Sequence, residues 1–310
     1  MKIVALGGGV GGAKLAHGLS KILSPDELTI IVNTGDDFNH FGLYISPDLD
    51  TICYTLSERA NVKTGWGRNE DSFNVLEEIR AYGGPDWFTL GDKDIALHME
   101  RTRLMQNGLT LTQASLKLET MMGLKHKILP MSNEKVSTIV HTNEYANMSF
   151  QDYFVSHKFQ PVVKGFTFEG IKKAIPAHEA ITALEESEAI IICPSNPFVS
   201  INPIIALDNI REILQNKYVV AVSPIVGGKA VRGPLGKMLA ELGYEVHPSA
   251  IIDLYKDFLD CIFVDMNDQN TKLKNNPSGI IIKVENILLP DIKTRMVLAK
   301  NIINHINKGK

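Results

Sequence analysis

The chain has 310 residues, of which 44% are hydrophobic and 22% charged, the balance of a globular protein with one large or two medium domains. Lysine and arginine total 32 against 35 aspartates and glutamates, so no basic excess is available to hold a nucleic-acid backbone. The three cysteines, Cys53, Cys193 and Cys261, form no CxxC pair and have no metal-ligand spacing, which indicates reduced thiols in a cytoplasmic protein.

The N-terminal apolar run Lys2–Leu6 ends at glycine after a few residues. It is too short for the apolar region of a signal peptide and predicts a first buried strand. No segment approaches the roughly 20 apolar residues that span a bilayer. We therefore expect a protein that is neither secreted nor embedded in a membrane.

Short apolar runs then alternate with helical patterns, which predicts a mostly parallel sheet with helices on both faces. A helix is expected from Ala13 to Leu23. Further strands are expected at Leu28–Val32, Trp87–Leu90, Ala189–Cys193, Tyr218–Val222 and Cys261–Val264, and an amphipathic helix at Ile292–Ile306. Loops rich in Gly, Pro, Ser, Asn or Asp follow these strands. Because ligands bind at the carboxyl ends of parallel strands, we expect these loops to share one rim of the sheet.

The pattern changes between residues 95 and 180. Ile95–Leu124 is typical of helix, whereas Val136–His141 and Val162–Phe168 alternate like antiparallel strands. We therefore expect a three-layer α/β core made of residues 1–94 and 181–310, with residues 95–180 inserted as a smaller α+β lobe.

A glycine-rich stretch, Gly7 to Gly12, follows the first strand and contains G-x-G-x-x-G. In a strand–loop–helix setting such glycines let backbone N–H groups approach a pyrophosphate, although they can also serve only to pack strand against helix. Asn33 replaces the acid that binds ribose in nicotinamide enzymes, and Ala13 stands where a P-loop has lysine. We therefore predict a nucleotide-diphosphate loop of another kind, with contacts from Gly9, Gly11, Gly12 and Lys14.

Two acidic loops follow the second strand and carry four carboxylates: Asp36, Asp37, Asp48 and Asp50. Hard oxygen ligands suit magnesium that bridges phosphates, and one carboxylate can instead accept a hydroxyl proton. The structural alternative is helix capping, since Asp48 or Asp50 can cap a helix that begins near Thr51. Two acidic clusters near one phosphate loop favour the chemical role.

The loop Gly91-Asp92-Lys93-Asp94 places Lys93 at a strand-to-helix junction, where it is the best functional candidate. His98, Arg101 and Arg103 follow at helical spacing. For the two arginines a solvated helix face is the slightly favoured interpretation.

Two later loops also follow buried strands. Ser195 and Asn196 lie between two prolines, where they can bind a base edge or a ribose or form only a rigid turn. Gly228 and Lys229 lie in a second glycine-rich basic loop that suits another phosphate contact. The histidines without partners at ligand spacing are interpreted as structural or surface residues: His40, His126 and His247.

Six of these segments occur together: GGGVGGAK, NTGDD, SPDLDT, LGDKD, PSNPFVSINPI and SPIVGGKAVRGP. Each is weak alone, but the set resembles the 2-phospho-L-lactate transferase (CofD) family in that family's order, from residue 1 to about 265. That family makes the deazaflavin coenzyme F-420. It joins the deazaflavin Fo to a lactyl or enolpyruvyl diphosphoguanosine and releases GMP with magnesium.

The resemblance implies a Rossmann-like core and a homodimer that acts on small molecules. It places Asp50 and Lys93 at the deazaflavin, and the glycine loop with Ser195 and Asn196 at the guanosine diphosphate. It further implies magnesium on Asp50, helped by Asp36 or Asp37, with Asp50 and Asp36 as the catalytic pair.

Two other functions stay open. A related branch, the gluconeogenesis-factor (YvcK-like) proteins, shares the first loops but binds nucleotide sugars without a known transferase reaction; LGDKD and SPDLDT favour the transferase. A nicotinamide oxidoreductase is disfavoured by Asn33. The spacing does not distinguish a lactyl from an enolpyruvyl donor.

Overall fold

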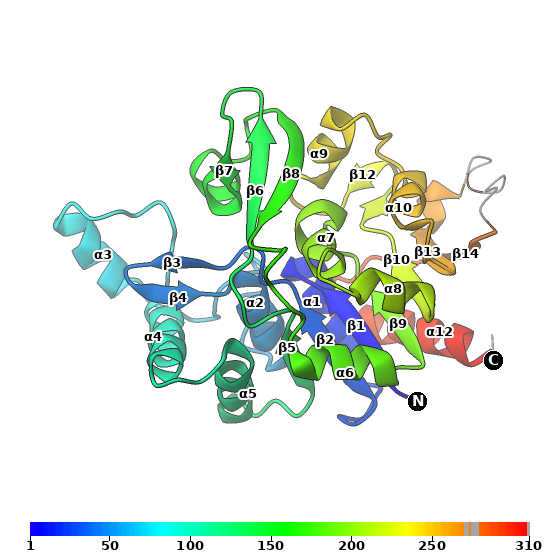
Figure 1. The fold of residues 1–310 in the computed structure, drawn as a ribbon, viewed down its shortest axis with the longest axis horizontal. Coiled ribbons are helices and arrows are strands. Elements are labelled where there is room, and N and C mark those ends of the chain that lie inside the picture. The colour runs from blue at the N-terminus through cyan, green and yellow to red at the C-terminus, as the bar shows by residue number, and fades with distance from the viewer. Residues whose placement is uncertain (270–272, 274–278, 309–310) are drawn as a thin grey trace.

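The computed structural model describes residues 1–269, 273 and 279–308. At its centre lies a seven-stranded sheet in the order β14-β13-β10-β9-β1-β2-β5, in which every neighbouring pair is parallel. Helices cover both sides (Figure 1), which confirms the predicted α/β fold. The strands are β1 (Ile3–Gly7), β2 (Leu28–Val32), β5 (Lys127–Pro130), β9 (Ala189–Ile192), β10 (Tyr218–Val222), β13 (Cys261–Asp265) and β14 (Ile281–Glu285).

The inner strands β1, β9 and β10 are apolar because both of their faces are buried, whereas the edge strand β14 carries Lys283 and Glu285 and is partly exposed. Along β1, Ile3 and Ala5 face one hydrophobic layer while Val4 and Leu6 face the other, as the period of two in a strand requires. The first layer contains α1, α2 and α12, and the second contains α6 to α10. The main core is therefore two apolar layers, one on each side of the sheet, and a smaller apolar cluster lies between α2, α4 and α5.

Most of the helices lie between strands of the chain, as parallel connections require. Their bounds are α1 (Gly9–Ser20), α2 (Pro47–Leu56), α3 (Asn74–Ala81), α4 (Asp92–Gln106), α5 (Leu111–Met121), α6 (His178–Glu186), α7 (Asn202–Ile205), α8 (Ile210–Gln215), α9 (Leu235–Glu241), α10 (Pro248–Tyr255) and α12 (Ile292–Lys308). Among the described residues, no helix combines the length and the apolar character needed to cross a membrane.

Within the described residues, three small antiparallel sheets lie outside the central sheet. They are β3–β4 (Phe38–His40 and Leu43–Ile45), β7-β6-β8 (Met148–Ser149, Ser137–Thr142 and Val163–Glu169) and β11–β12 (Ile225–Val226 and Lys229–Ala230). The strands predicted near Val136 and Val162 are thus confirmed as the antiparallel pair β6 and β8. Strand β5, although it falls within residues 95–180, pairs with β2 in the central sheet.

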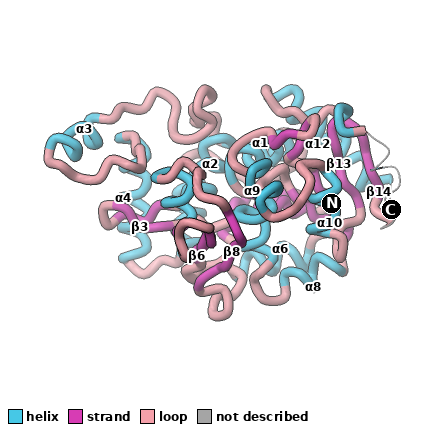
Figure 2. Tube along the Cα trace, turned by 90° about the horizontal axis from the view of Figure 1, so that it is seen from above, coloured by secondary structure: helices cyan, strands magenta, loops and turns pink. Residues whose placement is uncertain are grey.

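The division into a core and an inserted lobe therefore stays a prediction, and residues 270–272, 274–278 and 309–310 of the predicted core lie outside the described residues. Figures 1 and 2 agree that α3 and α4, with the β3–β4 hairpin beside them, extend to the end of the molecule opposite the C-terminus.

Two predicted elements differ from the structure. Residues Trp87–Leu90 form no strand; the Trp87 and Phe88 rings pack against Phe38 instead of joining a ladder. Helix α1 begins at Gly9, four residues before the expected Ala13, so most of the glycines lie in its first turn. In both segments, contacts with residues distant in the sequence determine the backbone conformation.

Glu119 of α5 has a buried carboxyl group. The residue is 3% exposed, and its side chain accepts a hydrogen bond from the Ile128 N–H at 3.3 Å. Burial raises its pKa from 4.5 to about 8, so the folded state holds a proton that the unfolded state releases above pH 4.5. This group therefore costs stability as pH rises from 4.5 toward 8. We expect Glu119→Gln to flatten that slope and to add at least about 1 kcal/mol at pH 8, measured by denaturant unfolding at pH 5 and pH 8. An unchanged slope would contradict this assignment.

Candidate active site

The turn from β1 into α1 uses its backbone donors on side chains of other loops. The Gly9 N–H, with φ at +61°, donates to Asp48 Oδ1 at 2.7 Å. The Gly8 N–H donates to Ser195 Oγ at 3.1 Å, and the Ser195 hydroxyl donates back to the Gly8 carbonyl at 2.9 Å. The turn, the first turn of α2 and the loop after β9 thus meet at one point, close to the carboxyl ends of β1 and β9.

Close packing explains why this turn consists of glycines. A Cβ on Gly8 would collide with Asp48, and one on Gly11 would collide with the Pro194 carbonyl. A Cβ on Gly12 would lie 2.6 Å from Ser195 Oγ. The glycines therefore let the helix start approach two other loops, which is the structural role that the sequence left open.

Asp48 joins the two acidic segments through hydrogen bonds to its carboxylate. Its Oδ2 accepts the side-chain N–H of Asn33 at 3.0 Å, and Asn33 in turn accepts the Gly35 N–H at 2.8 Å. Burial raises the pKa of Asp48 to about 6, although the hydrogen bonds from Asn33 and Gly9 oppose the shift. The Asn33 amide thus links the two acidic segments. An aspartate at position 33 would instead place a second negative charge against Asp48.

Asp36 is buried next to Asp48. Burial raises its pKa well above the ordinary value, and the charges of Asp48 and Asp37 raise it further. Its Oδ1 has no hydrogen-bond partner among the residues that the structure describes. Within the same residues neither Asp36 nor Asp48 forms an ion pair, so two buried carboxylates lie together without a cation. Burial and the neighbouring charge therefore favour the protonated form of Asp36, and a cation bound nearby would relieve the same cost.

Asp37 interacts with different residues from those around Asp36. Its two oxygens accept the Ser46 hydroxyl, each at 2.8 Å. Burial raises its pKa well above the usual value, and Ser46 and the Arg101 charge lower it. The adjacent residues Asp36 and Asp37 therefore belong to two networks.

Asp50 lies in the first turn of α2 and is 5% exposed. Both terminal nitrogens of Arg101 in α4 donate to the Asp50 carboxylate, Nη2 to Oδ1 and Nη1 to Oδ2, the latter at 3.1 Å. His98 Nδ1 lies 3.5 Å from Oδ2. Burial lowers the pKa of His98 to about 4, so the imidazole is neutral at pH 7. Asp50 is thus half of a buried ion pair.

The expectation of a solvated face is wrong for Arg101, which is 3% exposed, because α4 packs on β4 and α5 and its Arg101 side chain pairs with Asp50 of α2. Arg103 is exposed and pairs with Glu100 of its own helix, as expected for a solvated position. The two arginines are two positions apart in α4 and therefore lie on opposite faces of the helix, of which only the Arg101 face packs inward.

Lys93 lies in the first turn of α4 with its side chain exposed, and its ammonium donates to the Glu70 carbonyl. Its own N–H donates to Asp71 Oδ1 at 2.8 Å, so Asp71 caps the helix. The next residue, Asp94, is buried; burial raises its pKa to about 6, and the Asp50 charge contributes to the shift. Helix α4 therefore brings the LGDKD segment to the side of the molecule that holds Asp50.

A cationic group lies along α1. Lys14 is half-buried, and its pKa is lowered by burial and by the charges of Arg295 and Arg232. The Arg295 guanidinium contacts His17 Nδ1 at 3.0 Å, one turn further along α1. Arg232 comes from the predicted basic loop and lies against Gly65. Arg295 comes from α12, and sequence reasoning missed it because no motif surrounds it.

In two of the predicted nucleotide-binding loops, groups of the loop already hydrogen-bond within the protein. The N–H groups of Gly227 and Gly228 both donate to Asp268 at 2.9 Å, and Lys229 beside them is exposed. Asn196 accepts the Phe198 N–H at 3.0 Å and caps the turn of helix that follows. In this conformation Gly228 and Asn196 therefore serve their own loops.

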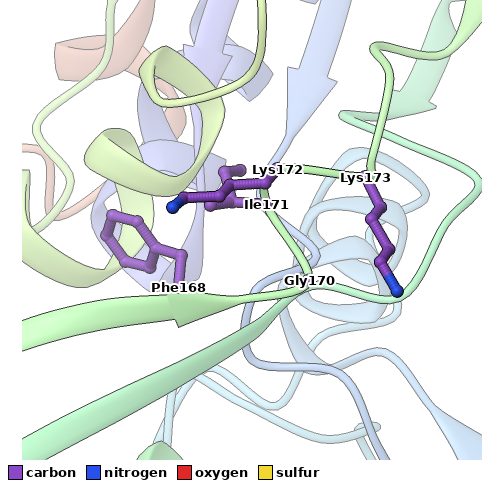
Figure 3. A pocket seen from close by; sticks show the side chains of 5 residues that line it. All are labelled: Phe168, Gly170, Ile171, Lys172 and Lys173. Atoms are coloured by element: carbon purple, nitrogen blue, oxygen red, sulfur yellow. The ribbon is translucent and has the colours of Figure 1, made fainter.

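A shallow hollow opens beside the end of β8, lined by Phe168, Gly170, Ile171, Lys172 and Lys173 (Figure 3). Lys172 extends along it toward Phe168, whereas Lys173 points away. It contains none of the predicted site residues. The predicted site residues lie elsewhere, on the segments that follow the strands, and the described residues contain no group of three or more His, Cys, Asp or Glu side chains that could hold a metal ion.

Comparison with known proteins places this arrangement in a family. Residues 3–300 match the family model described as 2-phospho-L-lactate transferase CofD. A 2-phospho-L-lactate transferase of Methanosarcina mazei is 40% identical over 267 residues, which are 86% of this chain and 88% of that protein. One from Methanocaldococcus jannaschii is 37% identical over 304 residues, 97% of each chain.

A crystal structure of a UPF0052 family protein from Bacillus halodurans has the same fold, with a TM-score of 0.66 at 15% identity over 97% of this chain and 99% of that one. That likeness supports the Rossmann-like α/β architecture alone. The family model and the relatives cover nearly the whole chain, including every loop described above. The chain therefore belongs to the 2-phospho-L-lactate transferase (CofD) family.

Proposed function

We propose that this protein transfers the phospholactyl or phosphoenolpyruvyl group of a diphosphoguanosine ester to the ribityl hydroxyl of the deazaflavin Fo, which releases GMP and completes a step of F-420 biosynthesis. The observation that carries the proposal is the similarity, over 97% of both chains, to a protein named 2-phospho-L-lactate transferase. The meeting of the glycine turn, the acidic loops and the cationic group of α1 supports it, because phosphoryl transfer depends on neutralised charge and alignment.

The diphosphate side is proposed at the start of α1. Lys14, Arg232 and Arg295 provide positive charge along this helix, and its N-terminal end adds the favourable helix dipole. The N–H groups of Gly8 and Gly9 are bonded to side chains, so these two residues shape the turn and the cations hold the phosphates.

Magnesium fits Asp36 and Asp48 better than the predicted Asp50. The first two carboxylates are buried, adjacent and without a cation, and Asp36 offers an oxygen with no partner among the described residues. Asp50 is already paired with Arg101. Magnesium needs only one or two carboxylates when phosphates and water complete its shell. When bound, it would neutralise the diphosphate and stabilise charge in the transition state.

The acceptor side is proposed at Asp50 and Lys93. Arg101 holds the Asp50 carboxylate in one orientation, in which it can orient a hydroxyl. Lys93, exposed at the start of α4, can reach a bound acceptor. We also propose a homodimer, which light scattering of the purified protein measures directly.

The test is incubation of the protein with Fo, the lactyl or enolpyruvyl donor and magnesium, followed by mass detection of the F-420 precursor and GMP. We expect both products with magnesium and neither with a chelator. Comparison of the two donors identifies the three-carbon acid. Absence of product, combined with heat stabilisation by a nucleotide sugar, would instead support a binding protein, and stabilisation by NAD exceeding that by GDP would contradict the guanosine site.

A further inference from the structure

The second glycine-rich loop folds into a small hairpin, residues 224–232, called here the basic hairpin. Its strands β11 and β12 pair antiparallel, with Gly227 and Gly228 alone between them. Their φ angles are +58° and +70°, as a tight two-residue turn requires. Just before the hairpin, the Ser223 N–H donates to the Phe263 carbonyl of β13 at 2.9 Å. The root of the hairpin is therefore tied to the central sheet.

The tip of the basic hairpin is held by Asp268. The Gly227 N–H donates to Asp268 Oδ2 and the Gly228 N–H donates to Oδ1, both at 2.9 Å. Asp268 is 3% exposed and ends the short helical turn after β13, which the Asp265 side chain caps. A buried carboxylate is costly unless its oxygens are paired, and here the tip supplies one N–H to each. The segment after β13 thus anchors the tip as well.

The chain that leaves the basic hairpin carries Arg232. The Val231 N–H donates to the Pro224 carbonyl at 3.1 Å, which closes the hairpin one residue before Arg232. The Arg232 guanidinium lies against Gly65, where a Cβ would collide with it, and its charge contributes to the lowered pKa of Lys14. The direction in which Arg232 leaves the sheet is therefore set by contacts at the root, tip and exit of the hairpin.

We propose that Asp268 is a positioning residue for the nucleotide diphosphate, which acts by holding the basic hairpin so that Arg232 meets the phosphates together with Lys14. The inference rests on the proposed function, in which Arg232 provides positive charge for the diphosphate, and it adds the residue that sets the position of that charge. A long cationic side chain whose backbone is fixed in advance loses less freedom when a ligand binds.

The test is the affinity for GDP, measured by calorimetry. We expect Arg232→Met to weaken GDP binding about tenfold or more, because a cation that pairs with phosphate is lost. Asp268→Asn should weaken it about fivefold, because asparagine presents one oxygen and one NH₂ group to two N–H donors and so releases the tip. Asp268→Ser places no NH₂ group against the tip and should weaken GDP binding by a similar factor. Affinity for Fo, measured by fluorescence titration, should stay unchanged in all three.

The double variant Asp268→Asn/Arg232→Met separates positioning from general support of the fold. If Asp268 acts through Arg232, the double variant binds GDP no more weakly than Arg232→Met alone, because the side chain that Asp268 positions is already gone. Asp260→Asn is the matched control. Asp260 lies at the other end of β13, and its Oδ2 accepts the Val219 N–H at 2.7 Å, so this variant loses a comparable bond and should keep its GDP affinity.

The outcomes separate the two proposals. If the unmodified protein does not bind GDP, the proposed function fails and the role of Asp268 fails with it. If it binds GDP and both Asp268 variants bind GDP equally well, only the positioning role fails. Losses that add in the double variant, or an equal loss in Asp260→Asn, would show that Asp268 supports the fold in general and would overturn the inference.

Discussion

Asp36→Asn should make the protein more stable and at the same time stop the transfer reaction. The Asp36 carboxylate is buried beside Asp48 and Asp37, and burial and both charges raise its pKa. At pH 7.5 its ionised form is therefore a cost to the folded state. Asparagine has nearly the same shape, removes that charge and can donate to a neighbouring oxygen. We expect a gain of at least about 1 kcal/mol in the free energy of unfolding without magnesium.

The same change removes half of the proposed magnesium site. Loss of a metal that neutralises a transferring group costs several kcal/mol of transition-state stabilisation, or about a thousandfold in rate. Magnesium should raise the melting temperature of the unmodified protein and leave that of the variant unchanged. Unfolding curves and GMP release at saturating substrates check both halves of the prediction.

Asp26→Asn is the matched control, because Asp26 is exposed and lies just before the amino end of β2, at the opposite edge of the sheet from the carboxyl ends of the strands. It should change neither quantity by a measurable amount. Near-normal GMP release from Asp36→Asn would contradict the role of Asp36 in catalysis, and a loss of stability would contradict the picture of an uncompensated buried charge.

The fold could be predicted from the sequence wherever burial determines the residue type. Buried parallel strands are continuous apolar runs between turn residues, and Ala189–Ile192 and Tyr218–Val222 match their predicted ranges within one residue. Trp87–Leu90 has a similar composition but packs ring against ring on a hairpin. A short apolar run does not specify whether its partners are strands or side chains.

The candidate site was predictable as a set of loops but not as a set of contacts. Spacing indicated that Asp48 and Asp50 lie near the glycine turn, yet nothing local shows that Asp48 caps Gly9 or that Asp50 pairs with Arg101. Helical periodicity cannot tell which face packs inward, so Arg101 was assigned to solvent. Arg295 joins Lys14 only because α12 packs on α1.

Arg101→Met should unfold the protein at a much lower denaturant concentration. Arg101 and Asp50 are 3% and 5% exposed, and removal of one partner leaves the other charge buried without compensation. Breaking such a pair typically costs about 3–5 kcal/mol, which is a large part of the stability of a domain. The midpoint of urea unfolding measures the loss.

The double variant Asp50→Asn/Arg101→Met then separates stability from chemistry. Removal of both charges leaves no uncompensated ion, so most of the lost stability should return, since replacing a whole buried pair is often close to neutral. Transfer should not return, because in the proposed reaction the Asp50 carboxylate orients the acceptor and asparagine has no charge with which to do so. If the refolded double variant released GMP at a near-normal rate, the Asp50–Arg101 pair would be a support between α2 and α4, and the acceptor would have to be held by other residues.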